Sequence, residues 1–146
     1  MTVVGTCVLA GWLLDVPMLR TVLPGWTAMM GNTASTFIVL GVGLWCATFR
    51  ASLAGSLIRW FCAVLAILVG GLTLIEYVLS VDLELDLLLP FELQRSQPVT
   101  FPGRMAPATA LCLLLSGFGL MFEGRPSLPQ YFASSTLFIS LIALAG

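Results

Sequence analysis

Five apolar segments, each nearly free of charge, constrain the fold of this chain more than any other feature. They occupy residues 3–14, 33–49, 57–79, 105–122 and 133–146. A transmembrane helix needs roughly 20 apolar residues to cross a hydrocarbon core of about 30 Å. The three middle segments approach or reach that length, whereas the first and the last are shorter. The sequence therefore predicts an all-α, polytopic helical bundle in the membrane, with four to five transmembrane helices.

The small number of charged residues supports this surrounding and excludes several functions. Only 9% of the residues are charged, whereas a soluble domain carries about 25%, so we expect the lipid bilayer to cover most side chains. The chain has no histidine, which removes imidazole ligands and histidine-assisted nucleophiles. Its six basic residues are scattered, so no nucleic acid is expected as a partner. We predict a non-catalytic segment without cofactor or metal.

The four cysteines are interpreted as small apolar packing residues. None belongs to a C-x-x-C pair, and each lies alone in an apolar run. Isolated cysteines in such runs behave as buried hydrophobic side chains. They are Cys7, Cys46, Cys62 and Cys112.

The first and last apolar segments suggest that these 146 residues form a single integral membrane domain, 1–146, of a longer chain. Residues 133–146 stay apolar to the last position, and a terminal carboxylate within hydrocarbon costs several kcal/mol. Residues 3–14 lack the basic start of a signal peptide and are followed by Asp15, which favours a membrane helix. A short interfacial helix at 133–146 is the alternative.

The arginines of the short connections predict the orientation. Arg50 and Arg59 flank the link between the second and third segments, and Arg125 follows the fourth. Short loops rich in arginine stay on the cytoplasmic side of a membrane. We therefore expect the loops 50–56 and 123–132 to be cytoplasmic, and the loops 15–32 and 80–104 to lie outside.

A doubled motif is the most informative local pattern. Residues Met29 to Leu44 have the form M-x-x-x-T-A-x(6)-G-x-G-L, and Met105 to Leu120 repeat it 76 positions later. A Pro-Gly pair precedes each copy. The spacing predicts a tandem repeat of two helical hairpins that enter from the same side. Hairpin one covers about 1–50 and hairpin two about 56–123, and a partial fifth helix follows at about 132–146.

The motif contains signals for starting and packing helices. We expect Thr33 or Thr109, together with Asn32, to cap the first turn of the following helix, and Pro107 to stand in such a turn. Its Gly-x-Gly pairs let helices approach closely in a membrane, with Gly70 and the glycine after it as a partner surface. The repeat is either purely structural or also frames a ligand pocket with its loop ends.

Glu76 is the one carboxylate placed well inside a long apolar segment. An ionisable group at membrane depth often marks a functional site. Glu76 also lies only about one turn before the polar run that starts at Ser80, which favours an ordinary interfacial carboxylate. Arg104 precedes the fourth segment, where we expect it to pair with Glu76 or with the acidic residues of the loop 80–104.

Tryptophans near segment ends favour anchoring at the lipid headgroups over ligand stacking. They are Trp12, Trp26, Trp45 and Trp60. The alternation of polar and apolar residues at 81–87 predicts a short outer strand or a helix on the surface. Its three acidic residues lack the glycine and the distal glutamate of a calcium loop.

Several motifs in order resemble the N-terminal multi-pass membrane sensor domain of bacterial signalling proteins. The matching stretches are G-W-L-L-D-V-P at 11–17, L-P-G at 23–25, N-T-A at 32–34, L-T-L-I-E-Y at 72–77, Asp82, Asp86 and P-G-R-M-A-P-A-T-A at 102–110. In such proteins, modules of this kind precede PAS, histidine-kinase or diguanylate-cyclase regions. The resemblance covers nearly the whole chain. This sequence departs from it at Ala108, where asparagine is expected.

The resemblance implies a sensory input module in a bacterial inner membrane. It implies that an outer or intramembrane stimulus is coupled to a cytoplasmic kinase or cyclase beyond this segment, with a homodimer formed through that output region. A small or lipid-soluble ligand is the expected stimulus. The candidate ligand or signal site contains Trp26, Met29, Asn32, Thr33, Glu76, Tyr77, Arg104, Met105 and Thr109. The alternative is a small structural or accessory subunit of a membrane complex. A transporter or membrane enzyme is disfavoured, because polar groups at mid-membrane are few.

Overall fold

The computed structural model describes residues 1–20, 29–48, 52–80, 105–125 and 127–145, and these form six helices and no strand. The helices are α1 (Thr2–Leu13), α2 (Pro17–Arg20), α3 (Gly31–Thr48), α4 (Leu53–Leu79), α5 (Pro107–Met121) and α6 (Leu128–Ala145). The all-α prediction is confirmed for the described residues. Five of the helices coincide with the five apolar segments, and the short α2 was not predicted.

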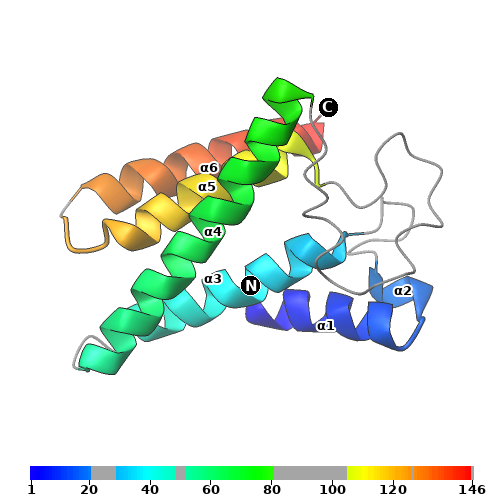
Figure 1. Ribbon diagram of the computed structural model, residues 1–146, viewed down its shortest axis with the longest axis horizontal. Helices are drawn as coiled ribbons and strands as arrows, with labels where there is room; N and C mark the ends of the chain where they lie inside the picture. The colour runs from blue at the N-terminus through cyan, green and yellow to red at the C-terminus, as the bar shows by residue number, and fades with distance from the viewer. Residues whose placement is uncertain (21–28, 49–51, 81–104, 126, 146) are drawn as a thin grey trace.

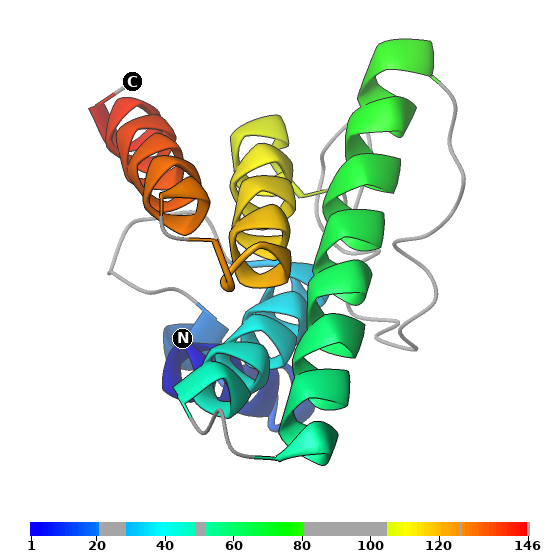
Figure 2. The ribbon, with the colours of Figure 1, turned by 90° about the vertical axis from the view of Figure 1, so that its left-hand side faces the viewer.

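The long helix α4 stands between two pairs of helices. It packs against α3 on one side and α5 on the other, while α1 packs on α3 and α6 on α5. Figure 1 shows α4 running diagonally between the pair α1–α3 and the pair α5–α6. In the view turned by 90°, the pair α5–α6 lies above the pair α1–α3, and α4 runs along one side of both (Figure 2). We call α1 with α3 hairpin one, and α4 with α5 hairpin two.

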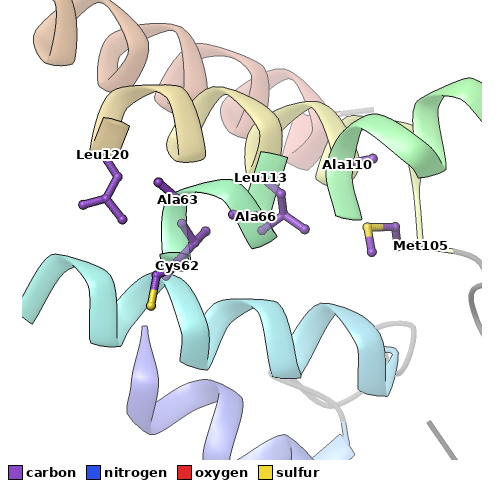
Figure 3. Close-up of a cluster of buried hydrophobic side chains, with 8 residues drawn as sticks. Cys62, Ala63, Ala66, Met105, Ala110, Leu113 and Leu120 are labelled. Atoms are coloured by element: carbon purple, nitrogen blue, oxygen red, sulfur yellow. The ribbon is translucent and has the colours of Figure 1, made fainter. Parts of the chain in front are cut away.

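Small residues of α4 let α5 approach closely. Ala63 and Ala66 are fully buried, and Gly70 lies two turns beyond Ala63 on the same side of α4. They meet Ala110 and Leu113 of α5 in the main core, which Figure 3 shows between the two helices. Tight contact between small residues is how membrane helices gain packing energy without a hydrophobic driving force.

The two hairpins make the same close contacts at equivalent positions. A Cβ on Gly5 of α1 would lie 2.6 Å from the carbonyl oxygen of Ala34 on α3, and a Cβ on Gly70 of α4 would lie 2.6 Å from that of Ala110 on α5. Ala34 and Ala110 occupy the same position of the doubled motif. Gly5 and Gly70 are 65 positions apart, so the first helices of the hairpins correspond at this offset.

The ends of α1 and α4 agree with the same offset. Asp15 has a φ of 54° just after α1, and Ser80, 65 positions later, has a φ of 51° just after α4. A left-handed residue commonly ends a helix and redirects the chain. After α1, the amide of Val16 donates to the carbonyl of Gly11 at 2.9 Å, which is the hydrogen bond of a Schellman motif.

The motif glycines separate into two roles. The first glycine of each pair faces the preceding helix of its own hairpin. A Cβ added to Gly41 would contact Thr2 of α1, and a Cβ added to Gly117 would lie 2.7 Å from Cγ1 of Ile67 on α4. The second glycine faces the following helix. A Cβ on Gly43 would lie 2.9 Å from Cβ of Cys62. Gly117 therefore meets α4 at Ile67 and Ala63, one to two turns before Gly70 and not at Gly70 as predicted, because the helices are antiparallel.

The predicted threonine caps are wrong. The residue before α5 is Ala106, which has an extended backbone and makes no side-chain cap hydrogen bond, and Pro107 begins the helix. Proline fixes the helical φ at this first position, so α5 starts two residues before Thr109. Asn32 and Thr33 likewise lie inside the first turn of α3, which begins at Gly31. Pro107 itself stands in the first turn as predicted.

Large apolar side chains are exposed on every long helix. Examples are Trp45 on α3 at 70% exposure, Phe61 on α4 at 65% and Phe138 on α6 at 66%. Soluble monomers rarely expose apolar patches of this extent. Among the described residues, one helix, α4, is long and apolar enough by itself to cross a membrane.

Candidate functional site

The end of α4 meets the start of α5 through a tyrosine. The hydroxyl of Tyr77 donates to the main-chain carbonyl of Met105 at 3.0 Å. Met105 is buried, and Tyr77 is 38% exposed. The residues just before α5 are therefore fixed to the last turn of α4 by a hydrogen bond between the two helices.

Glu76 lies next to Tyr77 and is buried within the bundle. Its side chain is 1% exposed, and Thr73, one turn earlier on the same face, is 3% exposed. Residues three apart on a helix share a face, so α4 presents a hydroxyl and a carboxyl group toward the interior. Glu76 is therefore covered by protein although it lies close to the end of α4, and its interpretation as an interfacial carboxylate stays a prediction.

Hairpin one has a tryptophan at the position of Tyr77. The indole Nε1 of Trp12 donates to the carbonyl of Met29 at 2.9 Å. Met29 and Met105 are the first residues of the two motif copies, and Trp12 and Tyr77 differ by the same 65 positions as the glycines. An aromatic N–H or O–H thus binds the same motif carbonyl in both hairpins. Trp12 is 1% exposed, so its prediction as a headgroup anchor is wrong.

Arg20 closes this end of hairpin one. Its guanidinium carbon lies 4.5 Å from the ring centroid of Trp12, and its Nε donates to the carbonyl of Gly11 at 3.2 Å. Arg20 also forms an ion pair with Asp15. Trp12 is covered by Arg20, which the short helix α2 carries back over the end of α1, and it also packs with Ala34 of α3 and with Met29.

The two hairpins differ most at the buried position before the aromatic residue. Hairpin one has Gly11 there, and a Cβ on Gly11 would lie 2.6 Å from Cβ of Leu19 on α2. Hairpin two has Glu76 at the same offset. In hairpin one the backbone of α2 takes the space beside the helix, whereas hairpin two places a carboxyl group there.

The remaining predicted site residues follow the two methionines at the start of α3 and α5. Thr33 is buried, Thr109 is half-buried, and the carbonyl of Asn32 accepts a hydrogen bond from the hydroxyl of Thr36 at 2.8 Å. Of the predicted site, Glu76, Tyr77 and Met105 are brought together in hairpin two. Met29, Asn32 and Thr33 lie together in hairpin one.

Two predicted site residues, Trp26 and Arg104, lie outside the described residues, as does the pattern at 81–87. Thr73, Arg20 and the role of Trp12 were not predicted from the sequence. A comparison of the first and third apolar segments at an offset of 65 would have found two of them, because it aligns Trp12 with Tyr77 and Val8 with Thr73.

A second charged contact lies at the opposite end of α4. The guanidinium of Arg59 forms an ion pair with the carboxylate of Glu123 after α5, and both side chains are about one-fifth exposed. Within the described part of the chain, no group of three acidic or cysteine side chains is arranged to hold a metal ion. The chemistry of the site is therefore that of one buried carboxyl group with a hydroxyl group on either side along α4.

Comparison with protein-family models, with curated proteins and with solved structures finds no match to this chain.

Proposed function

We propose that this chain is a multi-pass, membrane-embedded sensory input module of a bacterial signalling protein. The observation that carries the proposal is the polar buried face of α4. Thr73 and Glu76 are inside hairpin two at the positions where hairpin one has Val8 and Gly11. A buried ionisable group in a membrane helix is a functional-site hypothesis by default, because its burial is costly. The fold does not need it, since hairpin one makes the same contacts without it.

The multi-pass arrangement is supported by the apolar surfaces of the shorter helices. α6 is 18 residues long and has no buried residue among those described, and lipid is the surrounding that accepts such a helix. The expected orientation places Glu76 and the motif carbonyls near the outer face, in a bacterial inner membrane. The link through α4 then joins this end to the cytoplasmic end at Arg59.

In the proposed mechanism, a stimulus at Glu76 favours one packing of hairpin two against hairpin one. The hydrogen bond from Tyr77 to Met105 transmits a movement of the end of α4 directly to the start of α5. Ligands act by shifting populations between existing packings, and small helix shifts at interfaces are a common form of such change. α6 and an output domain beyond it would receive the shift.

A distance measurement between the hairpins tests this mechanism. Spin labels on the exposed Cys7 of α1 and on Val78→Cys of α4, in a chain whose other cysteines are alanine, report how the hairpins are arranged in lipid nanodiscs. We expect two distances, and we expect Glu76→Gln to change their ratio by about fivefold or more. Ile75→Gln, on the exposed side of the same turn, is the control. One unchanged distance in all three proteins would contradict the sensor mechanism.

The mass of the native chain separates the sensor from the accessory subunit. An immunoblot of native membranes with an antibody against these residues measures it directly. The sensor proposal expects a product far heavier than 15.6 kDa, because a cytoplasmic kinase or cyclase must be attached. A product of that mass alone would refute the proposal and favour the accessory subunit.

A further inference from the structure

A cavity of about 470 Å³ lies between α3, α5 and α6. It is at the end of α5 that carries Glu123, far from Met105 and Glu76. Leu40 and Leu44 of α3 form one wall, residues of α5 and α6 form others, and Met1 before α1 also lines the cavity. This site shares no residue with the candidate site described above.

Small residues create the cavity. Ser116 and Gly119 of α5 face Ala133 of α6 across it. Ser116 is the motif position that Leu40 occupies in hairpin one, where the leucine is buried in the core. The second copy of the motif therefore replaces a packed leucine by a serine at the wall of a cavity, and Ala133, which also lines this space, is exposed.

The interior of the cavity suits an alkyl chain. The hydroxyl of Thr136 donates to the carbonyl of Phe132 at 2.9 Å, and the hydroxyl of Ser140 donates to the carbonyl of Leu137 at 2.8 Å. Both hydroxyl hydrogens are thus used within α6. Ser116 carries the one other hydroxyl group of the lining. A ligand with a polar ring, such as a quinone, would therefore bury its carbonyl oxygens with at most one donor, at a cost, whereas an alkyl chain would not.

The length of the cavity fits one leaflet of a membrane. Its lining on α6 extends from Pro129 to Ser140, which is about 16 Å at the ~1.5 Å rise per residue of an α-helix. Half of the hydrocarbon core is about 15 Å. An acyl chain that enters from the headgroup region would therefore reach from Pro129 to the bilayer centre.

The charged side chains next to this end of the cavity are on balance positive, although the lining itself contributes only one carboxylate. Glu123 lines it and is paired with Arg59, and the exposed Arg125 follows two residues later. Two guanidinium groups against one carboxylate favour an anionic partner, and guanidinium groups bind phosphate with charge-assisted hydrogen bonds. Tail and headgroup requirements therefore point to the same molecule.

We propose that this cavity binds one anionic glycerophospholipid, with an acyl chain between α5 and α6 and the phosphate beside Arg59 and Arg125. The site rests on the membrane placement in the proposed function, but not on the sensor mechanism. The bound lipid fills the space beside Ser116, the position where hairpin one has the side chain of Leu40. It joins α6 to the rest of the bundle.

The test is native mass spectrometry of the full chain, extracted by mild detergent from vesicles of equal parts dioleoyl phosphatidylglycerol and dioleoyl phosphatidylcholine. We expect one retained phosphatidylglycerol per chain. Ala133→Phe fills the cavity and should lower retention at least about tenfold. Ser134→Phe, the next residue and equally exposed, is the matched control. Arg125→Gln should reduce the preference for phosphatidylglycerol while leaving the ion pair of Arg59 intact.

Each outcome decides a separate point. Equal retention in Ala133→Phe and Ser134→Phe would overturn the cavity as the binding site. Equal retention of both lipids by the unaltered chain would overturn the anionic headgroup. Release of the chain from membranes by alkaline carbonate would overturn the membrane placement itself, before any lipid is measured. A helical circular dichroism spectrum equal to that of the unaltered chain confirms that each variant is folded.

Discussion

Hairpin one and hairpin two have the same backbone contacts and different interiors. In both, a glycine of the first helix touches a motif alanine, an aromatic residue donates to a motif methionine, and a left-handed residue follows the first helix. Hairpin one then closes with Arg20 over Trp12, whereas hairpin two buries Glu76. The shared contacts determine the geometry of a hairpin, and the differing residues are available for function.

The largest expected effect tests a shared contact. In Gly70→Ala, the new Cβ would lie 2.6 Å from the oxygen of Ala110 and 2.9 Å from the amide nitrogen of Leu114, so α4 and α5 must separate. Overpacking against backbone should lower the free energy of unfolding by about 3 kcal/mol. Denaturation in mixed micelles, followed by circular dichroism, measures the loss.

The neighbouring glycine is the matched control. A Cβ on Gly71 would lie 3.4 Å from Cδ1 of Leu114, which is ordinary contact with a flexible side chain. Gly71→Ala should therefore be neutral or stabilise by up to about 1 kcal/mol through helix propensity. Equal destabilisation by both substitutions would contradict the close contact at Gly70.

The next prediction concerns the position where the hairpins differ. Gly11→Ala would place a Cβ 2.6 Å from Cβ of Leu19 and 2.9 Å from its carbonyl carbon. We expect α2 to detach from α1, with a loss of about 2 kcal/mol, limited because a short element can unfold locally. Faster hydrogen exchange confined to α2 would show this. Uniform exchange changes across the bundle would argue against a local role for Gly11.

Replacing each aromatic donor by phenylalanine compares the two hairpins directly. Trp12→Phe removes a hydrogen bond and weakens the contact with Arg20, so we expect a loss of about 2 kcal/mol. Tyr77→Phe removes only a hydrogen bond from a partly exposed side chain, and about 1 kcal/mol is expected. Denaturation in the same micelles measures both. A larger loss for Tyr77→Phe would mean that hairpin two depends on this bond more than hairpin one.

The sequence predicted the helices well and their pairing in part. Helices follow charge-free runs closely, because in lipid each backbone group must be satisfied within its own helix. The four-residue α2 has no such signal, and it depends on the turn at Asp15. The equivalence of α3 and α5 was visible in the motif, whereas that of α1 and α4 rests on a few small or aromatic residues such as Gly5 and Gly70.

The candidate site was predicted by residue type but not by environment. Glu76 stood out because a carboxylate in an apolar run is rare. Its burial depends on how the folded chain covers the end of α4, which no local pattern records. Trp12 was interpreted as an anchor because a tryptophan near a helix end usually is one. Its burial comes from packing against Ala34 and Met29 and from the return of α2 with Arg20.

The smallest effect should come from the ion pair of Arg59 and Glu123. Hairpin one has no equivalent of Glu123, because Ala47 stands 76 positions earlier, three residues after the first copy of the motif. Both side chains are about one-fifth exposed, so desolvation offsets much of the attraction. A double-mutant cycle with Arg59→Gln and Glu123→Gln should give a coupling of about 0.5–1 kcal/mol. The pair joins the first turns of α4 to the end of α5, and its loss should loosen hairpin two only.

If the hydrogen exchange of the α1 and α3 amides also becomes faster, the two hairpins do not fold as separate units. A coupling near zero would mean that packing at Ala63 and Gly117 alone holds this end of hairpin two together.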